Sequence, residues 1–174
     1  MERCAVLLRG INVGRGNRLA MADLRALLED LGCRDVSTYV NSGNALVTAD
    51  PEGLAERVEA ALPLPVRVVV FTADELAEAV RQCPWPERAE ASPKLVHVGY
   101  LNRLPPTEAL EALDALSGRH GDDELAVGPR VLYLSYASNS VDSPLAKALG
   151  RAKLDVVVTT RNWTTARKLV ALTG

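Results

Sequence analysis

The spacing of apolar residues predicts the same order of elements, β-α-β-β-α-β, in both halves of the chain. In the first half, strand-like apolar runs cover residues 3–9, 36–40, 45–48 and 66–71. A helical pattern over residues 21–31 and an Asp-Pro helix start at residue 50 supply two helices. This order is typical of the ferredoxin-like fold.

The second half shows the same order. Strands are predicted at residues 94–101, 125–127, 131–136 and 154–159, and helices at 106–116, 144–149 and 163–172. In the helix at 106–116 we expect Leu110 to face the core and Gly118 to end the helix. Thr72 and Glu75 have the spacing of a capping box, and the three prolines of residues 83–93 indicate a loop.

We therefore predict an α+β fold of two ferredoxin-like units followed by a C-terminal helix. The predicted boundaries are residues 1–72 for the first unit, 73–93 for a helix and proline-rich connector, and 94–174 for the second unit with the C-terminal helix. A single mixed sheet running through both halves would give the same pattern, so this alternative stays open.

Cysteine content and hydropathy indicate the compartment. The three cysteines, Cys4, Cys33 and Cys83, are odd in number and form no C-x-x-C pair, which is typical of a reducing cytosol. Cys4 and Cys33 fall in apolar runs and are predicted to be small buried side chains. The chain has neither a membrane-length apolar run nor a signal-peptide pattern, so we expect a soluble, cytoplasmic protein with no membrane partner.

The charge distribution says more than the net charge of −2, which by itself makes a nucleic-acid partner unlikely. Residues 1–18 carry four arginines and one acid, residues 147–174 carry six basic residues and one acid, and the middle is strongly acidic. Ordinary decoration of helix surfaces explains this pattern. The alternative is that both chain ends converge on one electropositive site.

The first of three polar segments, residues 9–18, contains three arginines, three glycines and two asparagines but no acid, and it directly precedes a predicted helix. Glycines let main-chain N–H groups approach a ligand, guanidinium groups bind carboxylate or phosphate, and a helix N-terminus favours anions. The glycine spacing fits neither a P-loop nor G-x-G-x-x-G. A flexible connection would also explain the glycines, but we predict anion contacts from Arg9, Asn12, Arg15, Asn17 and Arg18.

The second segment, residues 38–44, lies between two predicted strands, and here we predict ligand contacts from Tyr39, Asn41, Ser42 and Asn44. A tight hairpin alone would also require Ser-Gly-Asn. The third segment, residues 159–165, leads from a strand into the last helix, and it adds Thr160, Arg161, Asn162 and Thr164 to the predicted site. The alternative is that Asn162 or Thr164 only caps that helix.

Other chemistry is sparse. His97 alternates with leucines on its strand, which indicates a partly buried structural residue, and His120 lies in a glycine-flanked turn. No His, Cys, Asp or Glu cluster has metal-ligand spacing, so we predict no metal and no cofactor, and we assign no catalytic residue.

Several motifs occur together along nearly the whole chain. They are Arg9-Gly10-Ile11-Asn12-Val13-Gly14, Met21-Ala22-x-Leu24-Arg25, Gly32, Asp35-Val36-x-Thr38-Tyr39-x-Asn41-Ser42-Gly43-Asn44 and Thr159-Thr160-Arg161-Asn162-Trp163-x-Thr165. These motifs resemble domain of unknown function 1697, a bacterial family of small proteins. The resemblance implies that the three polar segments are the family's signature and implies no reaction or ligand. The chain departs from the family at Arg15, where glycine is usual, and at Val47, where an aromatic residue is usual.

Three functions are compatible with these patterns. The leading hypothesis is a domain that binds a small phosphorylated ligand or nucleotide where the three segments meet. An acylphosphatase-like hydrolase is the second, by analogy of fold, with Arg15 or Arg18 fixing phosphate and Asn41 orienting water. The third is an RNA- or protein-interaction module, which the acidic total and the lack of paired aromatic residues disfavour. Whether the chain is an enzyme, and its oligomeric state, are left open.

Overall fold

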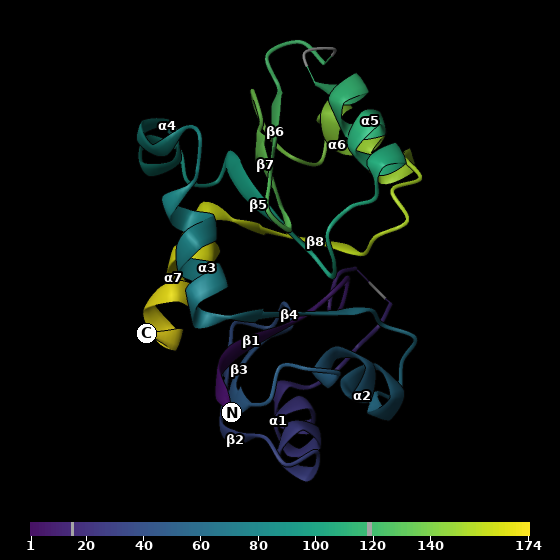
Figure 1. Cartoon of the computed structure of the whole chain (residues 1–174), viewed down its shortest axis with the longest axis vertical. Coiled ribbons are helices and arrows are strands. Elements are labelled where there is room, and N and C mark those ends of the chain that lie inside the picture. The colour runs from purple at the N-terminus through teal and green to yellow at the C-terminus, as the bar shows by residue number, and fades with distance from the viewer. Residues whose placement is uncertain (15, 118–119) are drawn as a thin grey trace. The chain divides into compact units, whose positions relative to one another are not determined.

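The computed structural model describes residues 1–14, 16–117 and 120–174, and the eight strands in these ranges form two separate four-stranded sheets (Figure 1). The chain divides into two compact units, residues 1–77 with 169–174 and residues 78–168. The division falls within α3 (Ala73–Arg81) and within α7 (Trp163–Thr173). The α+β prediction is confirmed, and the alternative of one shared mixed sheet is not what the strands form.

The sheet of the first unit has the strand order β2-β3-β1-β4, with antiparallel neighbours throughout. Its strands are β1 (Glu2–Leu8), β2 (Arg34–Tyr39), β3 (Asn44–Ala49) and β4 (Val68–Thr72). Helices α1 (Met21–Asp30) and α2 (Leu54–Ala61) lie on the same side of this sheet (Figure 1). This is the ferredoxin-like arrangement that the element order predicts.

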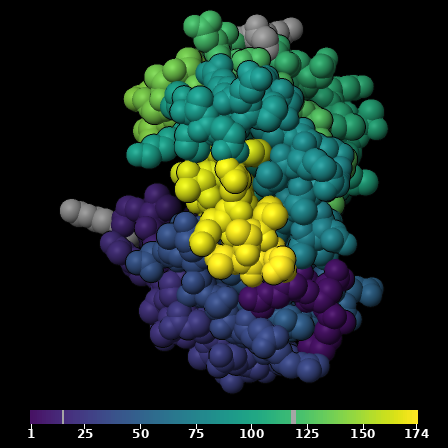
Figure 2. Space-filling model, turned by 90° about the vertical axis from the view of Figure 1, so that its left-hand side faces the viewer, coloured from purple at the N-terminus to yellow at the C-terminus, as the bar shows by residue number. Residues whose placement is uncertain are grey.

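The core of the first unit lies between that sheet face and the two helices. Alternate residues of β1, among them Cys4 and Val6, pack with Leu24 and Leu28 of α1 and with Val58 of α2. The predicted burial of Cys4 and Cys33 is confirmed, and Cys83 is buried as well. Residues Leu169–Gly174, from the C-terminal part of α7 to the end of the chain, also belong to this unit. Figure 2 shows the C-terminal segment in yellow at the surface.

The second unit repeats this arrangement with the strand order β6-β7-β5-β8. Its strands are β5 (Val96–Leu101), β6 (Glu124–Gly128), β7 (Val131–Ser135) and β8 (Val158–Asn162), and its helices include α4 (Pro86–Ala91), α5 (Thr107–Leu116) and α6 (Pro144–Arg151). Leu113 of α5 and Leu145 of α6 pack with Leu132 and Leu134 of β7 to form its core.

Equivalent hydrogen bonds show that the two units are structural repeats. The Leu8 N–H at the end of β1 donates to the Gly43 carbonyl at 2.8 Å, and the Leu101 N–H at the end of β5 donates to the Arg130 carbonyl at 2.9 Å. Gly43 and Arg130 both have left-handed main chains, with φ of 76° and 56°. Each of these residues directly precedes the third strand of its unit, so the turn between the second and third strands ends in the same way in both units.

Two elements begin later in the chain than predicted, because the main chain turns just before them. The helix expected after Asp50 begins only at Leu54, since the Asp50 carboxylate accepts the Glu52 N–H at 3.1 Å and Gly53 is left-handed. The last strand, β8, covers Val158–Asn162 and not residues 154–159, because Asp155 has a φ of 50°, which interrupts extended structure.

Two further predictions in the second unit were wrong. The loop expected at residues 83–93 contains α4, whose first residue is Pro86 and which buries Ala89. Proline is tolerated in the first turn of a helix because the N–H that it lacks would have no partner within the helix there. Leu110 is 41% exposed, because Ala109 and Leu113 form the inward stripe of α5. Gly118, the predicted end of α5, lies outside the described residues. None of the helices in the described part of the chain is long and apolar enough to span a membrane.

Candidate anion-binding site

The connection between β1 and α1 folds into a compact loop through repeated left-handed residues. Gly10, Asn12, Gly14 and Asn17 have φ values of 67°, 54°, 61° and 47°. Glycine and asparagine tolerate this conformation best, which explains their frequency in the segment. The equivalent connection between β5 and α5 is only residues 102–106, so the long loop is specific to the first unit.

The Asn12 side chain ties this loop to its surroundings. Its Nδ2 donates to the Leu19 carbonyl and to the Asn41 carbonyl, both at 2.8 Å, and its Oδ1 accepts the Leu19 N–H at 3.0 Å. The Asn12 main-chain N–H donates to the Asn17 carbonyl at 3.0 Å. One residue therefore joins the start of the loop, its end and the turn between β2 and β3.

The turn between β2 and β3 packs directly against the loop at Gly43. A Cβ added to Gly43 would lie 2.8 Å from Leu8 Cβ and 2.9 Å from Ile11 Cδ1, and the left-handed φ also disfavours any other residue. Beside it, the buried Asn44 donates from Nδ2 to the Tyr39 carbonyl at 3.1 Å and to Ser42 Oγ at 3.0 Å. The polar residues of this segment thus build the hairpin turn, as the hairpin alternative expected.

A pocket of about 510 Å³ opens where the loop, the turn and α1 come together. Its lining residues are Asn12, Arg18, Leu19, Ala20, Met21 and Asn41. Arg18 is exposed, and its guanidinium donates one hydrogen bond, to the Gly14 carbonyl at 3.1 Å. Five N–H donors on the guanidinium leave capacity for a ligand.

The N-terminus of α1 forms one side of this pocket. Its N-cap residue is Ala20, and among the residues that the structure describes no side-chain hydrogen bond caps this helix. These N–H groups carry the positive end of the helix dipole. The exposed Asp23 in the first turn is the one nearby acid of α1, and it does not line the pocket. The described lining of this pocket therefore contains one guanidinium group and no carboxylate.

Not all predicted residues of the first unit line this pocket. Asn12, Arg18 and Asn41 do, whereas the exposed Arg9 and the residues Tyr39, Ser42 and Asn44 do not. Asn17 is exposed and makes a long 3.4 Å bond to the Gly10 carbonyl, and Arg15 lies outside the described residues. Leu19, Ala20 and Met21 were missed, although the helix start predicted at Met21 was the signal that could have found them.

The third predicted segment belongs to the second unit, and its residues alternate between two sheet faces. Thr160 pairs with Gly99 and lies on one face of β8, while Arg161 pairs with Val98 and lies on the other. Asn162 Oδ1 accepts the Thr165 N–H at 3.0 Å, so Asn162 caps α7. Thr164 is exposed in the first turn of α7.

Arg161 itself is buried, with 8% of its surface exposed. Its guanidinium donates to Thr159 Oγ1 and to the Thr160 carbonyl, both at 2.8 Å. Burial lowers the pKa of Arg161 to about 10, against the opposing influence of nearby Tyr100. That this segment contributes to the same site as the first two stays a prediction.

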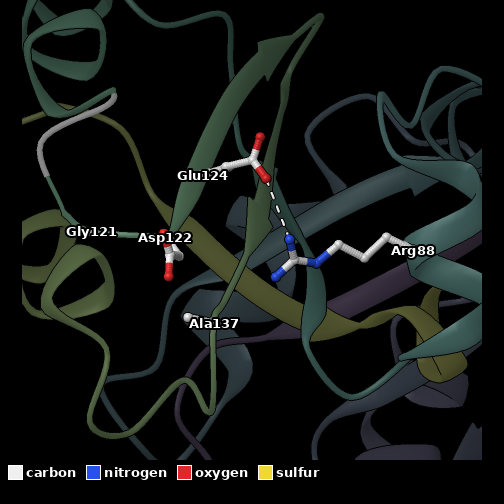
Figure 3. Close-up of a pocket in the computed structure, with 5 residues that line it drawn as sticks. All are labelled: Arg88, Gly121, Asp122, Glu124 and Ala137. Atoms are coloured by element: carbon white, nitrogen blue, oxygen red, sulfur yellow. Dashed lines mark hydrogen bonds and ion pairs between the residues drawn. The ribbon is translucent and has the colours of Figure 1, made fainter.

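A second pocket, of about 570 Å³, lies in the second unit and has the opposite character (Figure 3). Its lining residues are Arg88, Gly121, Asp122, Glu124 and Ala137. Arg88 already pairs with Glu124 at 3.4 Å and donates to the Tyr136 carbonyl at 3.0 Å. With its one cation engaged and two carboxylates in the lining, this pocket does not favour an anion. Within the described ranges, no group of His, Cys, Asp or Glu could hold a metal ion.

Comparison with known proteins gives a family and a fold. A family model described as "Protein of unknown function (DUF1697)" matches residues 1–133. The chain is similar to the solved structure of a conserved bacterial protein from Streptococcus pneumoniae, with 25% identity and a TM-score of 0.74 over 99% of this chain and 98% of that one. No curated protein matches the chain.

Proposed function

The chain belongs to the DUF1697 family of proteins of unknown function, as its motifs predicted, and we propose that its first unit binds a small phosphate-bearing ligand at the start of α1. The proposed ligand is a phosphorylated metabolite or a nucleotide. The observation that carries this proposal is that Arg18 lines the same pocket as the start of α1, where the N-cap residue Ala20 makes no side-chain cap bond.

The physical support is additive. A helix N-terminus stabilises an exposed anion by roughly 0.3–1 kcal/mol, and a hydrogen bond to a charged group is worth about 1.5–3 kcal/mol when water is excluded. Arg18 supplies such donors, and the exposed Asn41 amide adds neutral donors that suit a phosphate ester. Leu19 and Met21 offer apolar surface for the rest of the ligand.

Other predicted residues have a secondary role in the proposal. Arg9 and Arg15 would add positive charge, and Tyr39, Ser42 and Asn44 would shape the turn. The proposal assigns no ligand contact to Asn17, which does not line the pocket. Thr160, Arg161, Asn162 and Thr164 remain predicted contributors from the second unit.

The test is a titration of the full chain with inorganic phosphate, AMP and glucose 6-phosphate, followed by amide NMR and thermal unfolding. We expect the Met21 and Ala22 amide signals to move, and a ligand at 100 times its Kd should stabilise the protein by about 2.7 kcal/mol. Arg18→Ala should weaken binding about fivefold or more, the effect of roughly 1 kcal/mol.

Arg57→Ala is the matched control. Arg57 is also an exposed arginine of the first unit with one hydrogen bond, to the Glu52 carbonyl at 3.1 Å, but it lies outside the pocket lining. Its replacement should leave binding unchanged. Signals at α1 that stay fixed for all three probes would contradict the proposal.

A second candidate is hydrolysis of an acyl phosphate, because Arg18 and Asn41 line the same pocket. A guanidinium that fixes phosphate and an amide that orients water would lower the barrier by electrostatic stabilisation. Turnover of acetyl phosphate that disappears in Asn41→Ala would support it, and turnover unchanged in that variant would exclude Asn41 from the chemistry.

The proposal also includes a cytoplasmic location and no nucleic-acid partner. The three buried free thiols and the net charge of −2 support these two points. A gel shift with single-stranded RNA at low salt tests the second.

A further inference from the structure

We propose that Asn12 is a positioning residue, which fixes the shape of the pocket and does not bind the ligand through its side chain. This rests on the proposed function and assigns Asn12 a different role from the ligand contact that its sequence position predicts. It also implies that the pocket is formed before the ligand arrives, so that little ordering cost is left for binding.

The first argument is the use of donors. An anion must be bound by hydrogen-bond donors, and an asparagine amide has two N–H donors. Both are engaged, one with the Leu19 carbonyl and one with the Asn41 carbonyl, at 2.8 Å each. What remains on the side chain is acceptor capacity on Oδ1, which an anion cannot use.

The second argument is where the partners lie. Leu19 directly precedes the N-cap residue Ala20 and directly follows Arg18, and Asn12 binds both its N–H and its carbonyl. Asn41 is held through its own carbonyl. Asn12 therefore sets the path of the chain into α1 and the distance from there to the turn, which are the two sides of the pocket.

The third argument comes from Asn17, which has the same residue type in the same left-handed conformation. Its Nδ2 makes one hydrogen bond, a long 3.4 Å contact with the Gly10 carbonyl, and Asn17 does not line the pocket. Conformational preference alone thus accounts for Asn17, whereas the bonds of Asn12 exceed what a left-handed position needs.

The experiment replaces each asparagine with glycine, which keeps the left-handed main chain without strain and removes the whole side chain, including the amide. Asn12→Gly is the test and Asn17→Gly is the matched control. In the ligand-free protein, hydrogen exchange of the Leu19 amide should accelerate about tenfold or more in Asn12→Gly, because its acceptor is lost, and stay unchanged in Asn17→Gly.

Binding is then measured with inorganic phosphate and AMP at a temperature at which every variant is folded. We expect Asn12→Gly to weaken binding about tenfold, a change of about 1.4 kcal/mol. In the double variant with Arg18→Ala, the fold-loss of affinity should be smaller than the product of the two single fold-losses. A purely structural role would leave affinity unchanged, and a direct contact would make the two losses multiply.

Two results would overturn the inference. One is a full loss of affinity in Asn12→Gly with Leu19 exchange and pocket amide signals as in the wild type, which would make Asn12 a ligand contact. The other is unchanged affinity in spite of faster exchange. A wild-type protein that binds neither probe would overturn the proposed function instead, and the exchange rates of the ligand-free protein would still show whether Asn12 holds the loop end.

Discussion

The Ser143 hydroxyl donates a 2.7 Å hydrogen bond to the carboxylate of Asp123, and both residues are buried. The other carboxylate oxygen accepts the Ala137 N–H at 2.8 Å, and Ser143 Oγ accepts the Ala146 N–H that starts α6 at 2.9 Å. One buried acid thus joins the segment before β6, the end of β7 and the cap of α6.

This network predicts an acid-sensitive contribution to stability. Burial alone would raise the pKa of Asp123, but the bonds from Ser143, Ala137 and Leu145 outweigh it and lower the pKa. Because the folded pKa lies below the unfolded one, the contribution is present above the unfolded value of about 3.9 and is lost as the pH falls through the folded pKa. Urea unfolding between pH 7 and pH 2 measures this loss.

Substitutions isolate the network. Ser143→Ala removes the cap and leaves the carboxylate short of a donor, so we expect a loss of about 2 kcal/mol at pH 7. Asp123→Asn should reduce the dependence on acid pH, while Asp122→Asn, at the exposed neighbouring residue, should not. Equal pH profiles for the two variants would contradict this role of Asp123.

His97 predicts a second pH dependence, at higher pH. Its ring packs edge-on against Tyr136 with centroids 5.1 Å apart, and its buried Nδ1 has no hydrogen-bond partner in the described structure. Burial lowers the pKa of His97 from 6.5 to about 4. The unfolded state therefore binds the proton more readily, and stability should fall as the pH drops from about 6.5 to about 4, by about 3 kcal/mol at most.

His97→Gln should abolish this slope, because glutamine does not titrate. The other histidine provides the control, since His120→Gln should retain the slope. Urea midpoints at pH 7, 6, 5 and 4.5 are sufficient, and a wild-type midpoint that stays constant over this range would refute the expectation.

Elements that depend on neighbouring residues were predicted well. The capping box forms as expected, with the Thr72 N–H donating to the Glu75 carboxylate at 2.9 Å and the Glu75 N–H donating to Thr72 Oγ1 at 3.3 Å. Ser143 caps α6 with one such bond, because its Oγ accepts the N–H of Ala146 at 2.9 Å. In these cases the partner is three residues away, so the spacing along the chain determines the geometry.

The details of the candidate site depend on residues far apart in the chain and could not be predicted from spacing. Asn12 reaches the carbonyl of Asn41, and Gly43 is required because Leu8 and Ile11 occupy the space where a Cβ would lie. The sequence shows that such polar residues are present, but it does not show that Asn12 uses its amide to bind the main chain. The alternation of Thr160 and Arg161 on β8 was missed because the strand was predicted to end at residue 159.

Gly43 tests how closely the loop and the turn must fit. Gly43→Ala combines left-handed strain, about 1–2 kcal/mol, with overpacking against Leu8 and Ile11, about 1–3 kcal/mol. Gly14→Ala carries the same left-handed strain, but a Cβ there would meet nothing within 4 Å. Chemical unfolding should therefore show a clearly larger loss for Gly43→Ala, and similar losses would mean that the turn moves away from the loop.

Glu90 predicts a change that tryptophan fluorescence can follow. It lies in α4, the helix that sequence patterns missed, and its Oε1 accepts the indole N–H of the buried Trp163 at 3.0 Å. Its Oε2 pairs with Arg167 at 2.6 Å. Glu90→Ala leaves the indole N–H without this acceptor and removes the exposed ion pair, which is worth little by itself, so we expect a loss of about 1–2 kcal/mol and a shifted Trp163 emission.

Glu90→Gln separates the two contributions, because its amide oxygen still accepts from the indole while the charge is gone. We expect it to lose about 0.5 kcal/mol or less, the usual worth of an exposed pair, and to keep the wild-type emission. A Trp85→Phe background removes the signal of the other tryptophan. If Glu90→Gln destabilised the protein as much as Glu90→Ala, the charge pair with Arg167, and not the indole bond, would fix α4 against the start of α7.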